Sequence, residues 1–226
     1  MRAFAVTPIH LPDEEIRRRQ ERYDRLSPPG LQVVLRDVGA GAPPSLDTDA
    51  AVRRSEEAVA LALRDARADS AWDAAFPDCV LDPAVPAAVG GGDVPVHGLL
   101  KLSAGHLAAR GERFGAVVRN EAIGAELTRR LAAYGLTAHS AGVEVLDLPF
   151  DAIADTATWN AALGEAVARL AERGATAVLN GCSAVDVEPA ALAARIVDPT
   201  AVALRLLTVD ETPAGAAEPV EGAVRA

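Results

Sequence analysis

The chain has 226 residues, of which 50% are hydrophobic, 24% are charged and only 4% are aromatic. This length allows one large α/β domain or two small lobes that share a cleft, with a core built from Ala, Val and Leu. The formal net charge of −10 argues against a nucleic-acid partner, because such a surface needs clustered Lys and Arg. The basic run Arg17, Arg18 and Arg19 is interleaved with acidic residues, so we interpret it as a solvated helix face.

The sequence also bears on the compartment and on metal binding. No apolar run approaches the roughly 18 residues of a membrane helix, and no signal peptide is recognisable, so we expect a cytoplasmic protein without a membrane partner. Two cysteines in a reducing compartment seldom form a structural disulfide. The four histidines show no metal-ligand spacing, and we expect no metal.

From the N-terminus, apolar runs rich in Val and Ala alternate with amphipathic stretches, a pattern typical of βαβ units and parallel sheets. In the first half of the chain we expect a strand over 2–7, a helix over 13–26, a strand over 31–38, a helix over 48–67, and strands over 71–77 and 94–97.

The second half repeats this alternation. We expect a helix over 99–110, a strand over 113–118, a helix over 121–134, a strand within 137–146, a helix over 158–173, strands over 175–179 and 195–197, and a helix over 199–206. The C-terminal residues are rich in Ala, Pro, Glu and Gly, which predicts a disordered tail over 209–226.

The two halves place their cysteines at matching positions. Cys79 and Cys182 each end the third strand of their own half, which indicates two copies of one α/β unit. The predicted fold is therefore α/β with two pseudo-symmetric lobes, each a short, mostly parallel sheet flanked by helices. We assign residues 1–98 plus 199–208 to the first lobe and 99–198 to the second. The strand ends of both lobes would face a shared cleft that holds the active site.

A cysteine at the carboxyl end of a parallel strand lies where α/β proteins bind ligands. The backbone N–H groups that follow it, at Val80 and Leu81 or at Ser183 and Ala184, can stabilise a thiolate or hold a carboxylate. Two opposed cysteines suit proton transfer at a carbon next to a carbonyl, with one sulfur removing a proton and the other delivering one. The alternative is that both are ordinary buried core residues, as cysteine often is.

Two motifs around the cysteines carry a resemblance to a known family. They are Asp78-Cys79-Val80-Leu81-Asp82-Pro83 and Asn180-Gly181-Cys182-Ser183-Ala184. At this separation they resemble the aspartate/glutamate/hydantoin racemase superfamily, and within it the hydantoin racemase-like branch, over nearly the whole chain from Met1 to Leu207. The resemblance implies two lobes, no pyridoxal phosphate, metal or other cofactor, and a homo-oligomer. It also implies that Cys79 and Cys182 are the catalytic acid–base pair.

The residues around that pair depart from the family pattern. Such racemases usually have Asn or Asp after the first strand, where this chain has Thr7-Pro8-Ile9-His10, and often hydroxyl residues at the segment that here reads Val118-Arg119-Asn120. Amino-acid racemases of the group often have His after the second cysteine, where this chain has Ser183. We infer that neither glutamate nor aspartate is the natural substrate.

Several of these residues are candidates for substrate binding. Arg119 could clamp a carboxylate or could be a surface arginine, and His10 could orient a substrate or could be an exposed loop residue. Asp78 could bind a substrate amine, tune the thiol or serve a turn. The full set of expected substrate-binding residues is Thr7, His10, Asp78, Val80, Arg119, Asn120 and Ser183.

The leading hypothesis is a cofactor-independent isomerase that racemises or epimerises a carbon α to a carboxylate, amide or ring carbonyl of a small molecule. One alternative is cis–trans isomerisation of an unsaturated diacid by thiolate addition, as in maleate isomerases. A second alternative is a non-catalytic protein that binds a small molecule on the same scaffold. Decarboxylation of a malonate-like acid is less favoured, because the related decarboxylases keep only the second-lobe cysteine.

Overall fold

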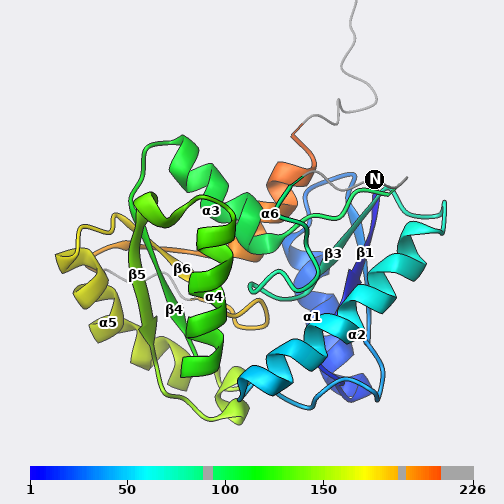
Figure 1. Cartoon of the computed structure of the whole chain (residues 1–226), viewed down its shortest axis with the longest axis horizontal. Coiled ribbons are helices and arrows are strands. Elements are labelled where there is room, and N and C mark those ends of the chain that lie inside the picture. Colours follow the sequence, from blue (N-terminus) through cyan, green and yellow to red (C-terminus); the bar gives the residue numbers. More distant parts are fainter. Residues whose placement is uncertain (89–93, 188–191, 210–226) are drawn as a thin grey trace, which may run out of the picture.

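The computed structural model describes residues 1–88, 94–187 and 192–209, and these form two α/β lobes, each built on a parallel sheet (Figure 1). The first sheet has the order β2-β1-β3, formed by β1 (Arg2–Val6), β2 (Gln32–Arg36) and β3 (Ala74–Pro77). The second has the order β5-β4-β6-β7, formed by β4 (Phe114–Val118), β5 (Ser140–Val145), β6 (Ala177–Asn180) and β7 (Arg195–Val197). The predicted two-lobe α/β fold is confirmed.

The two sheets repeat one topology. In each, the first strand lies in the centre, the second strand lies on one side and the third on the other, and all pairs are parallel. The strand predicted over 94–97 is reduced to a single bridge between Ala75 and Val96. Pro95 lacks a backbone N–H, and the chain enters a helix directly after Gly98, so this segment cannot extend the ladder as β7 does in the second sheet.

In the part of the chain that the structure describes, six helices cover the sheets, close to the predicted ranges. They are α1 (Asp13–Leu26), α2 (Asp49–Arg67), α3 (Leu99–Ala109), α4 (Glu121–Ala133), α5 (Thr156–Glu172) and α6 (Pro199–Leu207), with short 3₁₀ turns at η1 (Thr137–His139) and η2 (Phe150–Ile153). Side-chain caps fix the starts of α2 and α4, where Thr48 and Asn120 accept hydrogen bonds from Ala51 N and Ile123 N. No helix within these described ranges is long and apolar enough to cross a membrane. Except for Val209, the predicted tail lies outside the described residues.

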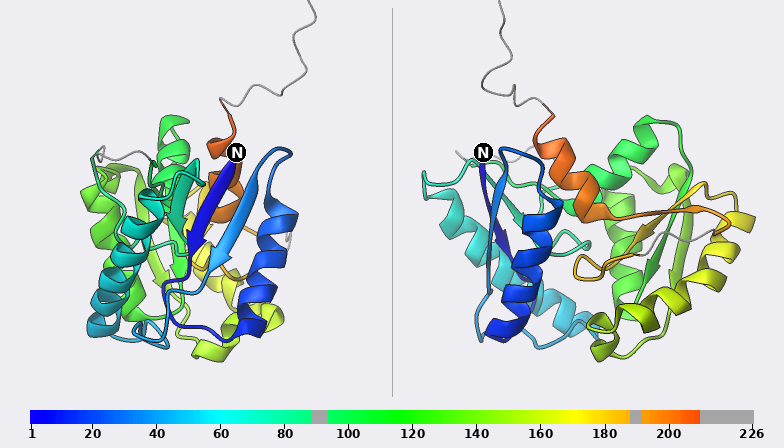
Figure 2. Two further views of the ribbon diagram at one scale, coloured as in Figure 1. Left: turned by 90° about the vertical axis from the view of Figure 1, so that its right-hand side faces the viewer. Right: turned by 180° about the vertical axis from the view of Figure 1, so that it is seen from behind.

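Helices α3 and α6 join the two lobes. Although α6 follows the second sheet, its Ala203 and Leu204 are buried in a cluster with Ala3 and Phe76 of the first sheet. Helix α3 follows the first lobe, and its Leu107 packs with the core of the second sheet. The two helices pack on each other, and the right-hand view of Figure 2 shows α6 (orange) between the lobes.

A buried carboxylate makes a second connection. Asp82, three residues after Cys79, accepts hydrogen bonds from the N–H groups of Leu100 (3.0 Å) and Lys101 (2.8 Å) in the first turn of α3, and from the Tyr134 hydroxyl (3.0 Å) after α4. A Cβ atom on Gly98 would lie 2.2 Å from Asp82 Oδ2, so the tight approach requires glycine there. Burial raises the pKa of Asp82 to about 6, although these three donors oppose the shift.

The raised pKa predicts how Asp82 affects stability. Because the folded pKa lies above the unfolded value, protonated Asp82 stabilises the fold below about pH 4, and this contribution is lost as the pH rises through about 6. Between pH 4 and 7, the free energy of unfolding of the wild type should therefore fall relative to that of Asp82→Asn by on the order of 2–3 kcal/mol. Urea unfolding at several pH values measures this difference.

The control is Asp69→Asn, which removes an exposed carboxylate from the same lobe. A constant difference between the wild type and Asp82→Asn across this pH range would contradict the assignment.

Candidate active site

A pocket of about 470 Å³, measured with its open mouth, lies between the carboxyl ends of the two sheets. From the first lobe it is lined by Pro8, Ile9, Arg19, Leu46, Asp78, Cys79, Val80 and Leu81. From the second lobe it is lined by Arg119, Ile123, Phe150, Ile153, Gly181, Cys182 and Ser183. Its walls are mostly apolar, and its polar groups are concentrated in the two cysteines, two arginines, one aspartate and one serine.

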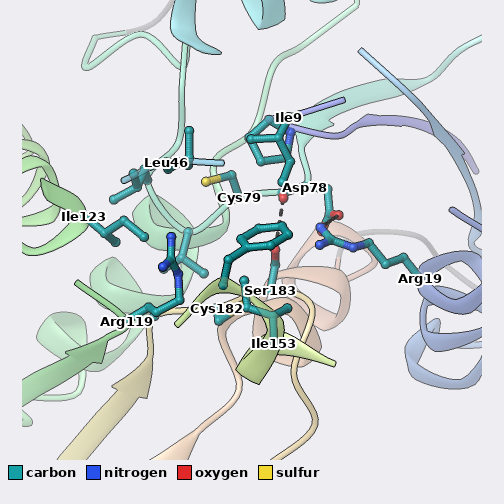
Figure 3. A pocket seen from close by; sticks show the side chains of 15 residues that line it. Ile9, Arg19, Leu46, Asp78, Cys79, Arg119, Ile123, Ile153, Cys182 and Ser183 are labelled. Atoms are coloured by element: carbon teal, nitrogen blue, oxygen red, sulfur yellow. Dashed lines mark hydrogen bonds and ion pairs between the residues drawn. The ribbon is translucent and has the colours of Figure 1, made fainter. Parts of the chain in front are cut away.

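The two cysteines occupy equivalent positions in the pocket. Cys79 lies two residues beyond the end of β3, and Cys182 lies two residues beyond the end of β6. Both are free thiols: Cys79 is 8% exposed and Cys182 is partly exposed. Figure 3 shows them on opposite walls, each carried by the loop of its own lobe. A small molecule in this pocket would have one sulfur from each lobe beside it.

Burial raises the pKa of both thiols. In each case the backbone N–H two residues further on, at Leu81 or Ala184, opposes this shift by favouring the thiolate. The carboxylates of Asp78 and Asp82, and a negative charge on Cys182, raise the pKa of Cys79 further. A charge on one cysteine therefore disfavours a charge on the other, which is the condition for one sulfur to act as a base while its partner holds a proton.

Asp78 is fully engaged inside the protein. Its carboxylate accepts hydrogen bonds from Arg19 Nη1 (3.0 Å) and the Tyr23 hydroxyl (2.7 Å), and burial together with this carboxylate raises the pKa of Tyr23. Its backbone oxygen accepts a hydrogen bond from Ser183 Oγ (3.0 Å), which links the two lobes inside the pocket (Figure 3). The carboxylate therefore acts as a partner for Arg19 and is not free to receive a substrate amine.

Arg119 extends from the end of β4 into the opposite side of the pocket (Figure 3). Its side chain is only 5% exposed, pairs with Asp47 and lies 5.6 Å from the centre of the Phe150 ring. Its Nε is buried without a hydrogen-bond partner among the described residues. Since a buried N–H without a partner is costly, Arg119 gains a hydrogen bond when its side chain shifts to donate this N–H to a ligand oxygen in the pocket.

Three of the expected binding residues are not brought to this pocket. The Thr7 hydroxyl donates to Asp37 (3.2 Å) and accepts from Val38 N (3.0 Å), so it ties the ends of β1 and β2 together. The exposed His10 ring contacts the same Asp37 at 2.7 Å. Asn120 caps α4 and donates to the backbone oxygen of Leu46 (3.0 Å), which holds a pocket wall in place.

Sequence reasoning missed Arg19 and the apolar wall. The prediction that the basic run is a solvated helix face is wrong for Arg19, which is buried, although Arg17 is exposed. The four-residue spacing of Arg19 and Tyr23 could have indicated that Arg19 is buried, because it puts both residues on one face of α1. For Ile9, Leu46, Ile123 and Ile153 the sequence carries no such signal, because a pocket wall and a core use the same residue types.

Within the described residues, no group of three or more His, Cys, Asp and Glu side chains is arranged to hold a metal ion.

Comparison with known proteins decides the family. The sequence pattern of the Asp/Glu/hydantoin racemase family matches residues 17–207. The chain belongs to this family. Membership identifies it as an enzyme of the racemase type, as the cysteine motifs predicted.

Several solved structures have a fold similar to that of this chain over most of its length. Allantoin racemase from Klebsiella pneumoniae is 21% identical with a TM-score of 0.72, covering 92% of this chain and 86% of its own. Allantoin racemase from Pseudomonas fluorescens is 17% identical with a TM-score of 0.74, covering 91% and 88%. An arylmalonate decarboxylase is 15% identical with a TM-score of 0.58, covering 94% of both chains. No curated protein sequence matches the chain.

The position of Cys182 in this racemase fold depends on the glycine before it. A Cβ atom on Gly181 would lie 2.3 Å from the backbone oxygen of Val117 and 2.7 Å from Val118 Cγ1. Gly181→Ala should therefore displace the loop that carries Cys182, lower the free energy of unfolding by about 1–3 kcal/mol and abolish turnover. Chemical denaturation and an activity assay measure both effects.

Gly164→Ala is the matched control, because Gly164 lies inside α5 of the same lobe with nothing within 4 Å of the added Cβ. It should stabilise the protein by about 0.5–1 kcal/mol. Equal behaviour of the two variants would contradict the assigned constraint.

Proposed function

We propose that this protein is a cofactor-independent racemase or epimerase in which Cys79 and Cys182 form the acid–base pair. The observation that carries the proposal is the placement of two free thiols on opposite walls of one pocket, at equivalent strand ends of two repeated lobes. Family membership supports the same reaction class.

The proposed reaction is a two-sided proton transfer at a carbon next to a carbonyl. One sulfur, as thiolate, takes the proton from one face of the carbon, and the electron pair of the broken C–H bond moves onto the carbonyl oxygen. The other sulfur, as thiol, then delivers its proton to the opposite face and is left as thiolate. Arg119 Nε, buried and without a partner, is suited to stabilise the oxygen as its negative charge develops.

The charge balance of the pocket favours a substrate with little net charge. Arg19 is already paired with Asp78 and Glu15, and Arg119 is paired with Asp47. Neither arginine is therefore unpaired and available to a substrate carboxylate. The remaining lining is mostly apolar. This supports a small amide or hydantoin-like ring rather than aspartate or glutamate, and the allantoin named for two structural neighbours is a first test compound.

We also infer how the working enzyme is organised. The packing of α6 on the first sheet supports a first lobe of 1–98 plus 199–208 and a second lobe of 99–198. The two free thiols are suited to a reducing compartment such as the cytoplasm. The homo-oligomer expected for this family is testable by light scattering of the purified protein.

Deuterium incorporation tests the reaction. In deuterated water, a single enantiomer of allantoin or of a 5-substituted hydantoin should lose optical activity and gain deuterium at the carbon beside the carbonyl. Cys79→Ala and Cys182→Ala should each lower this enzymatic rate by at least about 10³-fold, because each removes one of the two proton carriers. Polarimetry and mass spectrometry measure both quantities, with circular dichroism as a check on folding.

The outcomes separate the competing readings. Full activity in both folded cysteine variants would refute the acid–base pair. A covalent adduct on one cysteine with an unsaturated diacid would instead indicate cis–trans isomerisation. Binding of a ring compound with no deuterium incorporation by the wild type would indicate a non-catalytic binding protein.

The proposed role of Arg119 predicts a loss of transition-state stabilisation. Arg119→Met should lower kcat/KM by about 10²-fold or more, because it removes the unpartnered donor that we propose binds the substrate oxygen. Arg129→Met, which removes a more exposed arginine of α4 in the same lobe, is the control and should leave kcat/KM within about twofold of the wild type. Steady-state kinetics measure both; an unaffected Arg119→Met enzyme would argue against the role.

A further inference from the structure

Helix α1 of the first lobe lies directly against the turn that follows Cys182 in the second lobe. Arg18 Nη1 donates a hydrogen bond to the backbone oxygen of Ala184 (3.2 Å), and Arg22 Nη2 donates one to the backbone oxygen of Val185 (3.2 Å). Arg18 and Arg22 are four residues apart, so they lie one turn apart on the same face of α1. These contacts place α1 directly against the loop that carries the cysteine.

Arg19 lies between these two residues and reaches the pocket itself. Its side chain is 5% exposed, and it lines the pocket together with Cys182 and Ser183 (Figure 3). Arg19 Nη1 contacts Asp78 Oδ2 at 3.0 Å, and the backbone oxygen of the same Asp78 accepts the Ser183 hydroxyl at 3.0 Å. The guanidinium is thus held next to the Cys182 loop by two connected contacts, in a site where few water molecules screen its charge.

The charged groups around the two cysteines differ in sign. Burial raises the pKa of Cys182; Arg19 and Arg22 from α1 oppose this rise, and Asp78 from the loop after β3 adds to it. Facing Cys79 are Asp78 and Asp82, which add to the effect of burial in raising its pKa. The two thiols therefore occupy equivalent positions in the repeated fold but unequal electrostatic surroundings.

We propose that Arg19 is a positioning residue that makes Cys182 the first of the two thiols to lose its proton, so that Cys182 acts as the thiolate while Cys79 carries the proton. In its catalytic meaning this inference rests on the proposed function. The Cys182 thiolate would take the proton from the substrate carbon, with an S–H bond formed and the C–H bond broken. The Cys79 thiol would give its proton to the opposite face, and the charge would then lie on Cys79. Proton exchange with solvent returns Cys79 to the thiol form before the next turnover, and Cys182 again is the thiol that loses its proton first.

Alkylation without substrate tests this directly on the full chain. The rate at which iodoacetamide modifies each cysteine is followed against pH by peptide mass spectrometry, since the thiolate is the reactive form. In the wild type, Cys182 should react at lower pH than Cys79. In Arg19→Met, the Cys182 profile should move to higher pH, with alkylation about tenfold slower at a given pH on the rising limb, while the Cys79 profile stays in place.

Two matched variants separate charge from structure. Arg19→Lys keeps a positive charge and should restore most of the wild-type Cys182 profile. Arg18→Met removes a neighbouring α1 arginine that also contacts the Cys182 turn but is 38% exposed, and should leave the profile unchanged. An unshifted Cys182 profile in folded Arg19→Met would overturn the proposal, as would an equal shift in Arg18→Met.

The wild-type comparison alone is decisive if Arg19→Met does not fold, because Cys79 reacting at the lower pH would overturn the assignment. These results do not depend on turnover. If the alkylation profiles are as expected but no deuterium is incorporated, the inference about Arg19 and the two thiols holds and the proposed racemase function is refuted. If it is active, the acidic limb of its kcat/KM profile should move to higher pH in Arg19→Met and return in Arg19→Lys.

Discussion

The buried ion pair between Arg19 and Asp78 is the interaction on which the rest of the site depends. Two charges inside a protein are costly unless each is also hydrogen-bonded, and here Glu15 and Tyr23 supply the remaining contacts. The pair joins α1 to the residue before Cys79, and the Asp78 backbone continues the connection to Ser183 beside Cys182. One network therefore fixes the two cysteine loops relative to each other.

The internal duplication explains why a single pocket can hold two equivalent thiols. Each lobe contributes one wall of the pocket, because the carboxyl ends of both sheets meet where the lobes pack. Helices α3 and α6 stabilise this arrangement by packing on each other. The Asp82 carboxylate, three residues after Cys79, stabilises it further by binding the first turn of α3. Relative motion of the lobes would change the separation of the sulfurs, so these connections bear on catalysis as well as on stability.

Asymmetry within this repeat gives the two ends of the pocket different tasks. At one end, Arg19 is paired with Asp78, and its positive charge lowers the pKa of Cys182 by more than the Asp78 charge raises it. At the other end, Arg119 is paired with Asp47 yet keeps a buried Nε without a partner, which suits it to a ligand oxygen. Pairing both arginines internally also limits the net charge that a substrate can bring into the pocket.

The sequence by itself determined the alternation of strands and helices, the duplication and the strand-end position of both cysteines, because these depend on local periodicity and spacing. It also pointed to Arg119 at a strand end. Only the tertiary structure decided that Arg19 is buried beside the site while Thr7 and His10 are turned towards Asp37. Those outcomes depend on tertiary contacts between residues 27 to 59 positions apart, and such contacts leave no trace in the local periodicity of a single chain.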